Sequence, residues 1–78
     1  MEEYRKWLET NPIRQYRISN GLTIGMLSGW VGVSGYTVQR WEAGIAKPSG
    51  RNMEKLLTVL PDLESEWDLW KQRNPLSS

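Results

Sequence analysis

Tyr36, Gln39 and Arg40 have side chains that hydrogen bond in a directed way, and they lie close together in the sequence. A guanidinium group can donate two parallel hydrogen bonds to the edge of guanine, and a carboxamide can pair in the same way with adenine. On a helix, the apolar residues Val38 and Trp41 define one face, so Tyr36 and Arg40 point away from it, with Gln39 at the margin. These residue types predict a helix surface that can recognise DNA bases.

The stretch from Thr23 to Glu42 contains this predicted helix. Thr23 and Ser34 are good N-cap residues for two short helices, and Gly32 lies between them. Each helix turns a narrow apolar stripe toward the same core, which predicts a helix-turn-helix, the unit that places its second helix in the DNA major groove. The small or apolar residues with this spacing are Leu27, Ser28, Val31, Val33, Val38 and Trp41.

Proline, glycine and asparagine divide the rest of the chain into further helical segments. No stretch shows the sustained alternation that is typical of a β-strand. We therefore expect an all-α fold, a compact bundle of about five helices that forms a single domain over residues 1–78. Its core covers residues 12–60, and terminal helices over residues 2–10 and 62–71 pack on that core or take part in dimerisation.

The helix-turn-helix pattern extends on both sides, and its spacing has no gap from Gly21 to Gly44. The pattern consists of Ile13, Arg17, Gly21, Leu22, Thr23, Leu27, Ser28, Val31, Gly32, Val33, Ser34, Val38, Trp41, Glu42, Ala43, Gly44, Pro48, Leu56 and Leu57. With these residues, the chain from Pro12 to Leu60 resembles the DNA-binding domain of lambda-type phage repressors, Cro proteins and the wider Xre family of bacterial regulators. The resemblance implies a lambda-repressor-like fold and a role in binding double-stranded DNA.

The resemblance also implies roles for individual residues. Tyr36, Gln39 and Arg40 are the expected base-reading side chains. Arg17 and Glu42 resemble the family's internal ion pair, which connects the helix before the helix-turn-helix to the end of the recognition helix. The residues expected to contact the DNA sugar-phosphate backbone are Thr23, Ser34, Gly35, Thr37, Lys47 and Arg51.

Two positions depart from the family pattern. Gly35 takes an early recognition-helix position where the family often has a base-reading side chain, and Ile24 replaces the usual polar residue at the start of the preceding helix. Gly25 and Gly29 leave the outer face of that helix bare, as if a phosphate backbone or another protein approached it closely. These departures keep a second interpretation open, a protein-binding module that has this fold but does not read DNA, such as an inhibitor of a host enzyme or an adaptor of the transcription machinery.

The composition argues against several other functions. The chain has no cysteine and no histidine, so the usual zinc ligands and the usual general base near neutral pH are absent. We therefore expect no catalytic residue, no metal, no cofactor and no small-molecule ligand. Acidic residues alternate along the last predicted helix but lack the glycine and glutamate of a calcium loop. No apolar run is long enough to span a membrane, so we expect a cytoplasmic protein with no membrane partner.

The formal net charge of +1 is unevenly distributed. Residues 10–55 contain six basic and two acidic side chains, a local charge of +4, whereas residues 56–70 contain four acidic and no basic ones, a local charge of −4. Such polarity lets one face approach a polyanion while the other is repelled. The acidic last helix is therefore expected to lie away from DNA.

Trp67 and Trp70 lie on one stripe of that last helix. They either cover a small core or form the surface of a homodimer. A homodimer is expected if the protein reads a palindromic operator, because two half-sites then lie about one helical turn apart. The function that combines these observations is a sequence-specific DNA-binding transcriptional regulator, a phage- or plasmid-type repressor that acts by occupying an operator.

Overall fold

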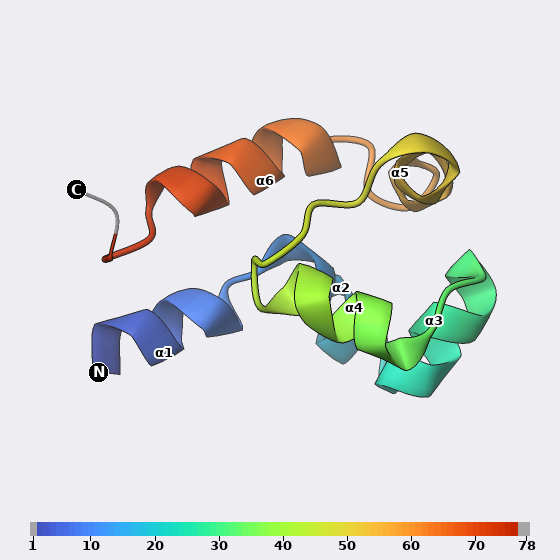
Figure 1. Ribbon diagram of the computed structural model, residues 1–78, viewed down its shortest axis with the longest axis horizontal. Coiled ribbons are helices and arrows are strands. Elements are labelled where there is room, and N and C mark those ends of the chain that lie inside the picture. Colours follow the sequence, from blue (N-terminus) through green and yellow to red (C-terminus); the bar gives the residue numbers. More distant parts are fainter. Residues whose placement is uncertain (1, 77–78) are drawn as a thin grey trace.

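The computed structural model describes residues 2–76, and this part of the chain forms six α-helices and no strand. They are α1 (Glu2–Glu9), α2 (Pro12–Ser19), α3 (Ile24–Val31), α4 (Gly35–Glu42), α5 (Gly50–Leu57) and α6 (Leu63–Gln72). The expected all-α fold is confirmed, with six helices in place of about five. Figure 1 shows α5 and α6 on one side of the molecule and α1 to α4 on the other, with both chain ends at the same end.

The helices begin where the sequence offers N-caps. The Asn11 side chain accepts hydrogen bonds from the backbone N–H groups of Ile13 and Arg14 at the start of α2. Thr23 and Ser34 cap α3 and α4 in the same way, as predicted. Gly32 ends α3 with a φ of +92°, a left-handed conformation that glycine adopts without steric cost, and the chain turns there into α4.

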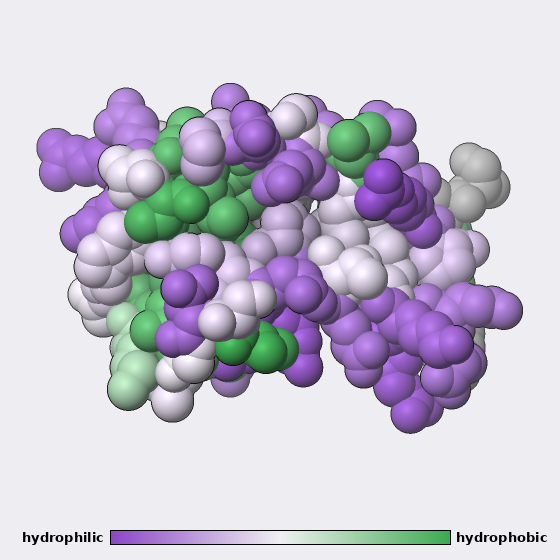
Figure 2. All heavy atoms as spheres, turned by 180° about the vertical axis from the view of Figure 1, so that it is seen from behind, coloured by the Kyte–Doolittle hydropathy of each residue, from purple (hydrophilic) through white to green (hydrophobic). Residues whose placement is uncertain are grey.

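Figure 2 shows the molecule from behind, where most hydrophobic side chains at the surface gather toward the end formed by α3 and α5. The end that carries the chain termini is mostly hydrophilic in this view. On α3, the large side chains Met26 and Trp30 are exposed, one turn apart. The Lys55 ammonium of α5 lies 5.1 Å from the centre of the Trp30 ring, a cation–π contact that covers part of the indole.

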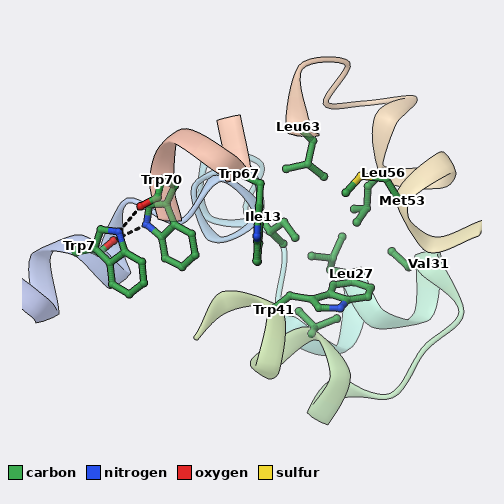
Figure 3. Packing of buried hydrophobic residues seen from close by; sticks show 11 residues of the cluster. Trp7, Ile13, Leu27, Val31, Trp41, Met53, Leu56, Leu63, Trp67 and Trp70 are labelled. Carbon is green, nitrogen blue, oxygen red and sulfur yellow. Dashed lines mark hydrogen bonds between the residues drawn. The ribbon is translucent and has the colours of Figure 1, made fainter. Parts of the chain in front are cut away.

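One continuous core lies between the helices, and every helix contributes at least one side chain to it. It consists of Trp7, Ile13, Leu27, Val31, Val38, Trp41, Met53, Leu56, Leu63, Trp67 and Trp70. Figure 3 shows the labelled side chains of this cluster converging from all six helices. The aromatic rings supply much of its apolar surface, which a chain of this length needs.

The alternative that Trp67 and Trp70 form a dimer surface is wrong. Their exposed fractions are 3% and 2%, so both indoles lie in the core of the single chain. The face of α6 that bears them packs toward α1 and α2 instead of facing solvent. Any dimer must therefore use other residues.

Trp7 of α1 and Trp70 of α6 form a reciprocal pair that joins the first helix to the last (Figure 3). Their rings stack 4.0 Å apart at an angle of 4°. The Trp7 Nε1–H donates to the Trp70 carbonyl at 2.6 Å, and the Trp70 Nε1–H donates to the Trp7 carbonyl at 2.8 Å. Since both indole N–H groups are satisfied inside the core, the pair fixes α1 on α6 without a desolvation cost for unpaired donors.

The backbone at Gly44 lies against both indole rings of this pair. We expect Gly44→Ala to lower the free energy of unfolding by about 2 kcal/mol or more. Its φ is +73°, and a Cβ there would lie 2.9 Å from the Trp70 Cη2 atom. Gly21→Ala is the matched control, because Gly21 has a φ of +66° but no atom within 4 Å of the added Cβ. Urea denaturation should find the Gly44 variant clearly less stable than the Gly21 variant; equal losses would mean that the indole moves aside freely.

Candidate nucleic-acid interface

α4 has the orientation that the sequence predicts. Val38 and Trp41 have exposed fractions of 0% and 2%, whereas Tyr36 is 66% exposed on the opposite face. Gln39 is also exposed, and Arg40 is half-buried. The helix therefore buries one narrow stripe and presents a polar face with three side chains that can hydrogen bond to base edges.

Tyr36 and Arg40 contact each other along that face. The Arg40 Nη1 donates to the Tyr36 hydroxyl at 3.3 Å, and the Arg40 guanidinium carbon lies 5.7 Å from the centre of the Tyr36 ring. Residues four apart on a helix are neighbours, which is why the two side chains meet. The tyrosine hydroxyl thus occupies one of the five guanidinium donors, and the other Arg40 donors have no hydrogen-bond partner within the described residues.

The starts of α3 and α4 lie side by side. A Cβ placed on Gly35 would be 3.5 Å from the Ile24 side chain, an ordinary van der Waals contact. The Thr23 and Ser34 hydroxyls accept from the N–H groups of Met26 and Thr37 at 3.0 and 3.1 Å. The remaining N–H groups of both first turns form two adjacent donor sites for an anion. This arrangement brings Thr23, Ser34, Gly35 and Thr37 to one edge of the helix-turn-helix.

Arg17 and Glu42 form the ion pair that the resemblance implies. The Arg17 Nε donates to Glu42 Oε2 at 2.7 Å and its Nη2 donates to Oε1 at 3.2 Å, a two-point contact. The Arg17 Nη1 also donates to the Leu22 carbonyl at 3.0 Å. The hydrogen bond to Glu42 raises the pKa of the Arg17 guanidinium, burial acts against it, and the negative charge of Glu42 raises it again. The pair therefore joins α2, the following loop and the end of α4.

Asn11 makes a second connection to α4 that sequence reasoning missed. Besides capping α2, its Nδ2 donates to the Trp41 carbonyl at 3.0 Å, and the residue is fully buried. The sequence identified Asn11 only as an N-cap, because its contact with α4 spans 30 residues of the chain. This contact holds α4 against α2 and donates to one of the terminal carbonyl groups of α4.

Lys47 and Arg51 lie where the chain leaves α4 and enters α5, and both are exposed. Lys47 is not free, because its Nζ lies 3.4 Å from an Asp68 oxygen and 3.8 Å from a Glu64 oxygen of α6. The acidic helix therefore reaches one of the expected phosphate contacts. Exposed ion pairs of this kind contribute about 1 kcal/mol or less, so a phosphate group can compete for the ammonium.

Comparison with known proteins agrees with this geometry. The model of a family described as helix-turn-helix matches residues 13–67 of the chain. No curated protein and no solved structure matches the chain. Within residues 2–76, no helix is long and apolar enough to cross a membrane.

Proposed function

The chain belongs to the helix-turn-helix family of Xre, Cro and lambda-repressor type, and from this premise we propose that it is a sequence-specific, double-stranded DNA-binding transcriptional regulator. The observation that carries the proposal is the orientation of α4. With Val38 and Trp41 buried, the base-reading candidates Tyr36, Gln39 and Arg40 project from the face that is free of the core. α4 enters the major groove, and the three side chains contact base edges.

The candidate backbone contacts surround that reading face. The first turns of α3 and α4 present N–H groups beside Thr23, Ser34, Gly35 and Thr37. Lys47 and Arg51 add two cations beyond the end of α4, with Lys47 exchanging its α6 carboxylates for phosphate oxygens on binding. Phosphate contacts fix the register of the protein on the duplex, and the base contacts supply specificity.

A finer proposal concerns the mode of regulation. We propose a repressor of phage or plasmid type that occupies an operator overlapping a promoter, in the cytoplasm where that DNA lies. It binds as a homodimer to a palindromic site, because a single helix of this length reads only one short half-site. Selection of bound fragments from a random DNA pool tests this, since a repressor dimer selects two inverted half-sites about one helical turn apart. Recovery of single, unpaired half-sites would contradict the dimer.

Arg40→Ala should weaken binding to the selected operator by about 1 to 3 kcal/mol and relax the preference at one base pair. The reason is that a guanidinium in the major groove distinguishes guanine through two hydrogen bonds. Gel-shift titration on the operator and on single-base variants measures both effects. If affinity fell equally on operator and random DNA, Arg40 would be a backbone contact.

A protein-binding module remains the second candidate, and one observation favours it. The outer face of α3 carries no charge, exposes Met26 and Trp30, and is otherwise formed by Gly25 and Gly29. An exposed apolar patch on a small domain is typical of an interface. Gel shifts at two salt concentrations separate the candidates, because a regulator binds random duplex measurably, with a Kd of about 10⁻⁴ to 10⁻⁶ M at physiological salt, and more tightly at lower salt. Absence of any duplex binding at these concentrations would support the protein-binding module.

A further inference from the structure

We propose that α1, which lies outside the matched family region, extends the DNA interface, with Arg5 and Arg14 binding a backbone phosphate of the duplex that α4 reads. This inference rests on the proposed DNA-binding function and adds a contact to it. It starts from an open groove of about 460 Å³ between α1, α2 and the start of the helix-turn-helix. Arg5 of α1 and Arg14 of α2 both line this groove, together with Ile24 and Gln39.

The groove is continuous with the proposed reading face. Gln39 of α4 lines it on one side, and Ile24, the first residue of α3, lines it on another. The same two helices carry the base-reading side chains and the N–H groups proposed to face phosphates. A duplex seated on α4 therefore runs across the mouth of the groove, and the nearest group of that duplex is its sugar-phosphate backbone.

The charges in the groove suit a phosphate. The Glu42 carboxylate lines it but is bound at two points by Arg17, so its charge is compensated within the protein. Arg14 lies 3.7 Å from one Glu42 oxygen, and its side chain is 39% exposed, which is a loose contact. None of the ion pairs within residues 2–76 includes Arg5. Two guanidinium groups thus have unused donors, which favour phosphate through paired hydrogen bonds.

α1 is held rigidly enough to present Arg5. The stacked and doubly hydrogen-bonded pair of Trp7 and Trp70 fixes the helix on α6, and the Thr10 and Asn11 N–H groups continue its last turn before α2 begins. Arg5, Leu8 and Glu9 occupy one helical stripe facing the groove, while Trp7 faces the core. Because the helix is already ordered, the contact costs little conformational entropy beyond that of the arginine side chain.

Glu9 provides a second test of the proposal. It lines the groove, and unlike Glu42 it forms no ion pair within residues 2–76. A carboxylate beside a bound phosphate repels it. Removing the negative charge with Glu9→Gln is therefore expected to strengthen duplex binding, whereas Arg5→Ala is expected to weaken it. The two substitutions act on neighbouring, exposed positions of one helix, and neither removes a core contact.

The experiment measures the affinity of the full chain for a short mixed-sequence duplex over a series of salt concentrations. For Arg5→Ala we expect weaker binding and a slope of log Kobs against log salt that is shallower by about one, the signature of one lost phosphate contact. Lys6→Ala is the matched control, since Lys6 is exposed on α1, carries the same charge and does not line the groove. Its slope should stay close to that of the parent protein.

The outcomes separate this inference from the function on which it rests. An Arg5→Ala slope equal to that of Lys6→Ala would overturn the phosphate contact, because both variants would then report only the overall charge. Weaker binding by Glu9→Gln would also overturn it. If the parent protein itself bound no duplex at any salt concentration, the proposed DNA-binding function would fail together with the inference. Circular dichroism of each variant verifies that the fold is retained.

Discussion

Replacing Trp70 with alanine is expected to lower the free energy of unfolding by about 3 to 5 kcal/mol. The substitution removes a buried indole that stacks on Trp7 and contacts Trp67, and it leaves a cavity between α1 and α6. It also removes one hydrogen bond to the Trp7 carbonyl, which keeps those from the Thr10 N–H and the Thr10 hydroxyl. A domain of this length is stable by only about 4 to 12 kcal/mol, so the variant should lose much of its stability. Urea denaturation followed by circular dichroism measures the loss.

Two further variants separate the contributions to this loss. Trp70→Phe keeps an aromatic ring in the core but removes the indole N–H, and it should cost about 0.5 to 1.5 kcal/mol, because one buried hydrogen bond is lost while the Trp7 carbonyl keeps its bonds from Thr10. Trp30→Ala is the control for the loss of an indole, since Trp30 is exposed on α3 and contacts the Lys55 ammonium instead of the core. It should cost about 1 kcal/mol or less. A Trp70→Ala variant as stable as Trp30→Ala would contradict the tryptophan pair as a structural clamp.

Glu42→Gln is expected to lower the free energy of unfolding by about 3 kcal/mol, at the lower end of the range for a broken buried ion pair. The Glu42 side chain is 7% exposed and binds Arg17 at two points, so the neutral amide leaves the guanidinium largely buried without its counter-charge. Glu54→Gln on the exposed face of α5 serves as the control for charge removal and should change stability by less than about 0.5 kcal/mol.

A double-mutant cycle isolates the pair itself. If Arg17 and Glu42 interact as the two-point contact indicates, Arg17→Met combined with Glu42→Gln should be more stable than the sum of the single losses predicts. Strict additivity would argue that the two charges do not interact in solution. The raised pKa of Arg17 means that its contribution is complete at any pH below the ordinary pKa of arginine and is lost only as the pH rises through the higher folded value. No loss of stability from this guanidinium is therefore expected across the neutral range.

The consequences of the Glu42 variant also extend to DNA binding. The pair and Asn11 both hold α4 against α2, the first through the Glu42 side chain and the second through the Trp41 carbonyl. α4 is a short helix of eight residues, so it depends on these contacts for its orientation. If α4 reads DNA as proposed, we expect a misplaced helix to lower specificity at Arg40 although none of the proposed base-reading side chains has changed.

The amino-acid sequence by itself determined the elements and the inner face of the reading helix. Caps such as Asn11, Thr23 and Ser34 act within the next three residues, and a helical repeat is a property of neighbouring positions. Val38 and Trp41 could therefore be assigned to the core, and Tyr36 to the exposed opposite face, from their spacing alone. The pairing of Arg17 with Glu42 needed more than spacing, and it came from the resemblance to a family.

Only the tertiary structure decided which partners the apolar and charged faces found. The stripe of Trp67 and Trp70 would suit a dimer or a core equally well, because burying an indole is favourable against either surface. In the folded chain both indoles are buried in the core, where Trp70 pairs with Trp7, 63 residues away in the sequence. In the same way, the charges along each helix did not predict that Lys47 pairs with Asp68 or that Arg5 and Arg14 line one groove. Such contacts depend on how separate helices dock, and the sequence of one helix carries no information about its neighbour's position.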